Sequence, residues 1–90
     1  MIKEKKQSFL EESNETSEEY KLVLYNDEVN TFQHVINCLV EICRHNPIQA
    51  EQCAWLVHNK GKYAVKTGTF EEIKLMCEKM LVEGLSANVE

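Results

Sequence analysis

The chain has 90 residues, of which 43% are hydrophobic and 28% are charged, and its formal net charge is -5. This length and composition predict one small soluble domain with a single core. The acidic excess argues against a nucleic-acid-binding surface, because such surfaces neutralise phosphates with Lys and Arg. No apolar run approaches the roughly 20 residues that span a bilayer, and the N-terminus lacks the apolar stretch of a secretory signal. We therefore expect a cytoplasmic protein without a membrane segment.

The N-terminal stretch differs from the rest of the chain. Residues 1–19 hold six Glu and few bulky apolar side chains. Such a stretch buries too little apolar area to offset the entropy of ordering it. We predict a disordered extension over residues 1–19 and a folded domain over residues 20–90. From composition alone, a solubilising leader and a flexible tether remain equally open.

From residue 20 onward, short strands and helices are expected to alternate. Residues 20–25 are β-branched and aromatic and stop at a turn-forming pair, which predicts a strand. Apolar residues at helical spacing predict a helix that starts near Phe32, capped by Asn30 or Thr31, and ends near His45-Asn46 because Pro47 disfavours helical geometry before it. Pro47 then opens a second helix.

The second helix is expected to stop at Gly61. Residues 62–67 alternate with period two and predict a strand. A third helix, capped by Thr69 and closed by Gly84, precedes a short last strand within residues 85–90. The order β-α-α-β-α-β predicts an α+β fold with a small three-stranded antiparallel sheet and three helices packed on it.

The densest polar group at an element boundary is Asn26-Asp27-Glu28. Helix capping explains these side chains locally, yet carboxylate and amide oxygens also suit an ammonium ligand. His58 lies where the second helix ends. It is either a favourable charge at the negative helix end or a hydrogen-bond acceptor. The residues alone leave these alternatives open.

Metal and thiol chemistry has weaker support in the sequence. The four cysteines, Cys38, Cys43, Cys53 and Cys77, form no C-x-x-C pair and are expected to be buried free thiols. His34 and Cys38 share a helical face, but a zinc site requires three or four ligands, and the sequence has no second ligand pair such as C-x-x-C to complete it. We therefore expect no metal, no cofactor and no catalytic residue.

Three motifs, together with the helix predicted from Phe32, resemble the ClpS adaptor family: Leu24–Glu28, Val57–Lys62 and Thr69–Glu71. The resemblance covers about residues 20–90. It implies a ClpS-like fold and a monomeric, non-enzymatic adaptor of the bacterial N-end rule pathway. Such an adaptor binds the free N-terminal residue of a substrate protein, a large hydrophobic N-degron, and delivers the substrate to a Clp AAA+ unfoldase. The extension would then help to hand the substrate over.

The resemblance also implies roles for individual residues. Asn26, Asp27 and His58 would bind the substrate α-amine, with Glu28 and Asn30 at the pocket mouth. The hydrophobic specificity pocket would consist of Phe32, Val35, Ala54, Val57 and Leu85. Glu71 would contact the N-terminal domain of the unfoldase.

The sequence departs from the family pattern at the pocket. Asn30-Thr31-Phe32 stands where the family usually has Thr-Pro-Met, and Ala54 replaces a common methionine. We hypothesise that the pocket accepts a broader range of first residues, including β-branched ones. Two other interpretations stay open: a generic protein-interaction domain of the same fold, and a thiol or metal-binding protein that uses His34, Cys38 and Cys43.

Overall fold

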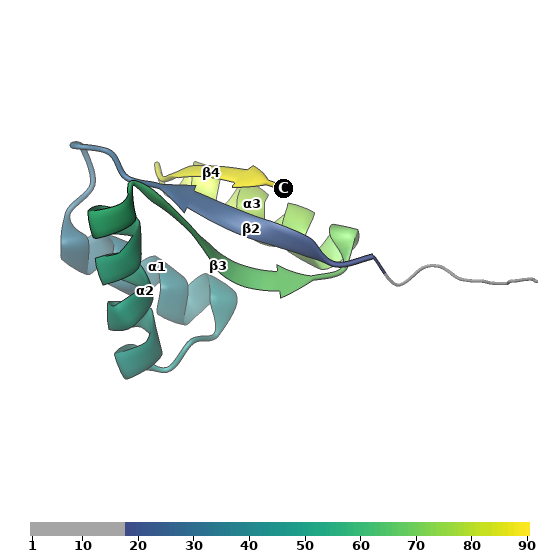
Figure 1. Ribbon diagram of the computed structural model, residues 1–90, viewed down its shortest axis with the longest axis horizontal. Helices are drawn as coiled ribbons and strands as arrows, with labels where there is room; N and C mark the ends of the chain where they lie inside the picture. The colour runs from purple at the N-terminus through teal and green to yellow at the C-terminus, as the bar shows by residue number, and fades with distance from the viewer. Residues whose placement is uncertain (1–17) are drawn as a thin grey trace, which may run out of the picture.

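The computed structural model describes residues 18–90, which form three strands and three helices in the order β-α-α-β-α-β (Figure 1). Their bounds are β2 Tyr20–Tyr25, α1 Phe32–Cys43, α2 Pro47–Lys60, β3 Lys62–Gly68, α3 Phe70–Val82 and β4 Ser86–Val89. The predicted element order and α+β class are confirmed. The predicted extension over residues 1–19 falls almost wholly outside the described residues and stays a prediction.

The sheet is antiparallel, with β2 in the centre between β3 and β4. Its register along β3 shifts between Leu22, which faces Lys66, and Val23, which faces Ala64. Val65 is therefore an extra residue in a β-bulge. The carbonyl of Val65 accepts a hydrogen bond from Nε2 of His45 at 2.7 Å. The bulge thus joins β3 to the segment that follows α1.

The helices cover the sheet in two groups. α3 lies behind β2 and β4, while α2 packs against β3 and α1 packs against α2 and α3 (Figure 1). The core lies between these layers. Its largest fully buried side chains are Leu22, Leu24, Leu39, Ile73, Met80 and Cys43. No helix among the described residues is long and apolar enough to cross a membrane.

Each helix begins at a side-chain cap. The hydroxyl of Thr31 accepts from the backbone N–H of His34 at 3.0 Å, so Thr31 rather than Asn30 caps α1. Asn46 caps α2, and Thr69 forms a reciprocal capping box at the start of α3. These side chains satisfy N–H groups that the first helical turn leaves unpaired.

Two element ends differ from the prediction. α1 ends at Cys43, before the predicted His45-Asn46, because Arg44 adopts a left-handed φ of 63°. The N–H groups of Arg44 and His45 both bond the carbonyl of Leu39, which closes the helix early. The last strand occupies only Ser86–Val89 of the expected residues 85–90. The four cysteines are free thiols, as expected, but only Cys38, Cys43 and Cys77 are buried, whereas Cys53 is partly exposed.

Candidate functional site

A cavity of about 530 Å³ opens where the end of β2, the start of α1, one face of α2 and the start of β4 meet. Its lining residues are Leu24, Tyr25, Asn26, Asp27, Asn30, Phe32, Val35, Glu51, Ala54, Trp55, Val57, His58, Leu85 and Ser86. This set includes every residue that was predicted for the amine site and for the hydrophobic pocket. It also includes Asn30, which was predicted at the mouth.

The polar mouth of the cavity brings Asn26 and His58 together. The backbone N–H of Asn26 donates to the carbonyl of Gly61 at 2.9 Å, which fixes the end of β2 beside the last turn of α2. Both side chains are exposed and make no hydrogen bond with any described residue. The Asn26 amide oxygen and an imidazole nitrogen of His58 are therefore available to accept from a ligand.

The carboxylate of Asp27 organises the loop between β2 and α1. One of its oxygens, Oδ1, accepts from the backbone N–H groups of Val29 and Asn30 at 3.0 and 2.9 Å. The bond from the Asn30 backbone is the main cause that lowers the pKa of Asp27 below its ordinary value. Ser86 also donates its hydroxyl to Oδ2 at 3.4 Å. Asp27 therefore carries a negative charge at the mouth while most of its acceptor capacity is already used.

The apolar wall of the cavity comes from α1, α2 and the residue before β4. Ala54, Val57 and Leu85 are 2%, 5% and 6% exposed, so their side chains form a nearly closed surface. Phe32 is 42% exposed and meets the ring of Trp55 edge to face, with centroids 6.4 Å apart. The wall is thus buried at its base and aromatic at its rim.

Two lining residues on α2 were not predicted. Glu51 and Trp55 are exposed, so they lie outside the apolar pattern that located the helix. Glu51, Trp55 and His58 follow one another at intervals of four and three residues, which places them on one helical face. The Trp55 and His58 rings lie 6.2 Å apart. The positions of Trp55 and Glu51, three and seven residues before His58, are the sequence signal that could have identified them as lining residues.

Two predicted residues do not line the cavity. Glu28 is exposed on the loop before α1, and Glu71 is exposed in the first turn of α3. Glu28 therefore acts at most through its charge. The role of Glu71 concerns a different surface and stays a prediction.

Comparison with known proteins agrees with this architecture. The family model described as ATP-dependent Clp protease adaptor protein ClpS matches residues 15–87. The chain belongs to the ClpS family. The ATP-dependent Clp protease adapter protein ClpS of Thermosynechococcus vestitus is 37% identical over 71 residues, which cover 74% of this chain and 72% of that protein. Its counterpart from Nostoc sp. is 35% identical over 71 residues, 74% of this chain and 70% of that protein.

Two further similarities extend the comparison of this ClpS-family protein. A segment of the E3 ubiquitin-protein ligase UBR1 of Drosophila melanogaster is 38% identical over 64 residues, 71% of this chain but 3% of that protein. The structure of Agrobacterium tumefaciens ClpS2 bound to L-phenylalaninamide superposes with a TM-score of 0.77 at 18% identity, covering 80% of this chain and 94% of that one. The predicted ClpS-like fold is confirmed.

Proposed function

We propose that this ClpS-family protein is a cytoplasmic adaptor that binds the free N-terminal residue of substrate proteins and delivers them to a Clp AAA+ unfoldase–protease. The observation that carries the proposal is one cavity with hydrogen-bond acceptors at its mouth and a buried apolar wall. An N-terminal residue presents the matching groups, an ammonium beside a side chain. The protein itself would catalyse no reaction.

The ammonium would be held at the mouth. The amide oxygen of Asn26 and an imidazole nitrogen of His58 accept its N–H groups, and the ionised Asp27 adds a favourable negative potential. Hydrogen bonds to charged groups contribute about 1.5–3 kcal/mol each. An acetylated terminus or an internal residue has no ammonium to place there and would leave these acceptors unpaired.

The first side chain would enter the apolar part of the cavity. Burying a large hydrophobic side chain stabilises a complex by about 1.5–3 kcal/mol. The cavity of about 530 Å³ lies within the usual size range of ligand pockets. L-phenylalaninamide, the ligand of A. tumefaciens ClpS2, combines a free α-amine with a benzyl side chain. We therefore expect ligands that begin with Leu, Phe, Tyr or Trp, with β-branched residues also accepted next to Ala54 and Phe32.

Delivery would use surfaces away from the cavity. The family description as a Clp protease adaptor supports an unfoldase partner. We propose that Glu71 on α3 contacts the N-terminal domain of that unfoldase, and that residues 1–19 assist the transfer. A variant that lacks residues 1–17 should bind peptides with unchanged affinity but fail to promote degradation of a Leu-initiated protein by a reconstituted unfoldase–peptidase.

A peptide titration tests the binding step. Two fluorescent peptides that begin with Leu, one with a free α-amine and one with an acetylated α-amine, are each titrated with the full-length protein. We expect acetylation to raise the Kd at least about 100-fold. It removes several hydrogen bonds to a charged group, each worth about 1.5–3 kcal/mol, and every 1.4 kcal/mol changes the Kd about tenfold. Equal affinities would instead support the alternative, a protein-interaction domain of the same fold that does not bind amino termini.

A further inference from the structure

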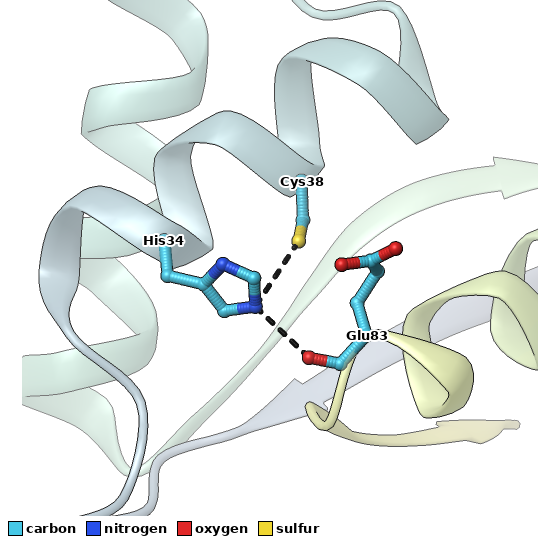
Figure 2. Close-up of side chains that lie close together, drawn as sticks. All are labelled: His34, Cys38 and Glu83. Carbon is cyan, nitrogen blue, oxygen red and sulfur yellow. Dashed lines mark hydrogen bonds between the residues drawn. The ribbon is translucent and has the colours of Figure 1, made fainter.

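A second group of reactive side chains lies outside the cavity, between α1 and the end of α3. His34 and Cys38 come from α1, and Glu83 follows α3 (Figure 2). One ligand atom from each of the three residues lies within 4.8 Å of the others. None of the three lines the cavity. We propose that these residues form a binding site for Zn²⁺.

The distances match the coordination geometry of zinc. Zinc–nitrogen and zinc–sulfur bonds of about 2.0–2.1 and 2.3 Å in a tetrahedral site place the two ligand atoms about 3.6 Å apart. Nε2 of His34 and Sγ of Cys38 are 3.7 Å apart. The Glu83 carboxylate turns toward the same space (Figure 2). Imidazole, thiolate and carboxylate are the usual zinc ligands, and three of them leave one position for water.

The charges of the cluster also favour a cation. A carboxylate oxygen of Glu83 lies within 4.8 Å of the Cys38 sulfur. Among residues 18–90, Glu83 forms no ion pair with Lys or Arg. The ion pair in this part of the chain joins Lys74 and Glu78. A divalent cation would compensate the Glu83 charge and stabilise the thiolate as Cys38 releases its proton.

The backbone and the helix spacing bring the three ligands together, but His34 also has a hydrogen-bond partner within the protein. Nε2 of His34 lies 2.9 Å from the backbone carbonyl of Glu83 and donates to it when it carries the proton. To bind zinc, Nε2 would give up this hydrogen bond and offer its lone pair, with the ring proton then on Nδ1. The i, i+4 spacing holds His34 and Cys38 on one face of α1. The site would therefore brace α1 against the turn between α3 and β4.

Zinc titration of the chelator-treated, reduced full-length protein tests the site. Isothermal titration should show one Zn²⁺ bound per chain, and Co²⁺ should give a thiolate-to-cobalt charge-transfer absorption band. Cys38→Ser and His34→Gln should each weaken Zn²⁺ binding at least tenfold and remove or shift the cobalt band. Glu83→Gln changes an exposed side chain, so it tests the site without destabilising the buried core.

The matched control is Cys53→Ser, which removes a thiol on α2 that is only partly buried. It should leave the stoichiometry and the cobalt band unchanged. The proposal is overturned if the wild-type protein binds no Zn²⁺, if Glu83→Gln and His34→Gln both leave the affinity unchanged, or if binding depends on Cys53. If Cys38→Ser fails to fold by circular dichroism, the His34 and Glu83 variants decide the question.

Discussion

The side-chain amide of Asn30 donates to both carboxylate oxygens of Asp27, at 3.2 Å to Oδ1 and 3.0 Å to Oδ2. The same amide donates to the carbonyl of Gly84 at 2.9 Å. Asp27 and Asn30 thus fasten the loop after β2 to the turn before β4. Asp27 therefore contributes to the candidate site through its charge and through the shape of the loop, whereas Asn26 keeps its acceptor free.

Removing either free acceptor should weaken the binding of amino-terminal peptides. We expect Asn26→Ala and His58→Ala each to raise the Kd of a Leu-initiated peptide at least about tenfold, because each removes a hydrogen bond to a charged group. Fluorescence anisotropy measures the change. Asn37→Ala, on the exposed side of α1, is the control and should bind like the wild type. Unchanged affinity in both pocket variants would exclude them as amine ligands.

Restoring bulk at Ala54 should narrow the range of first residues. Ala54 is 2% exposed and lies in the cavity wall, so the longer side chain of Ala54→Met would occupy cavity space. In the wild type, we expect peptides that begin with Ile or Val to bind within a hundredfold of the Leu peptide. Ala54→Met should widen that gap, as measured by competition titration. Ile and Val peptides that already bind over a hundredfold more weakly to the wild type would refute the hypothesis of a broad pocket.

The hydrogen bonds to Asp27 should make stability depend on pH. Since they lower the pKa of Asp27 in the folded state, its contribution is fully present above about pH 4 and is lost as the pH falls through the folded pKa. Wild type should therefore exceed Asp27→Asn in unfolding free energy at pH 6, and the difference should shrink toward pH 2. Urea unfolding across this range measures it.

Glu28→Gln is the control for the Asp27 experiment, because it removes a negative charge from the same loop at an exposed position. A stability difference between wild type and Asp27→Asn that stays constant from pH 6 to pH 2 would contradict the assignment of the pH dependence to this carboxylate.

The cysteines should differ in reactivity. Burial raises the pKa of Cys43 to about 11, so about one molecule in a thousand would carry its thiolate at pH 8. We expect iodoacetamide to modify the partly buried Cys53 well before Cys43, as followed by mass mapping of peptides. In urea the difference between the two should disappear. Equal rates in the folded protein would show that the core around Cys43 opens readily.

Local sequence signals located most of the fold. Residues that cap or break helices, such as Thr69, Pro47 and Gly61, affect only the few residues next to them, so their effect can be predicted from the sequence. The structure has helix boundaries at all three. The early end of α1 was missed, because Arg44 has no side-chain feature that forces a left-handed conformation. Trp55 was also missed as a pocket residue, because its role depends on contacts between helices. Its exposed position follows from the helical pattern, but its contact with Phe32 depends on how α1 packs against α2.

The sequence by itself determined the element order, the starts of the helices and, through three joined motifs, membership of the ClpS family. These depend on residue type and spacing along the chain. Only the tertiary structure decided which side chains share a space. Asn26 and His58 line the same cavity because the end of β2 bonds to Gly61. Glu83 joins His34 and Cys38 because α3 packs against α1, a contact that no local pattern encodes.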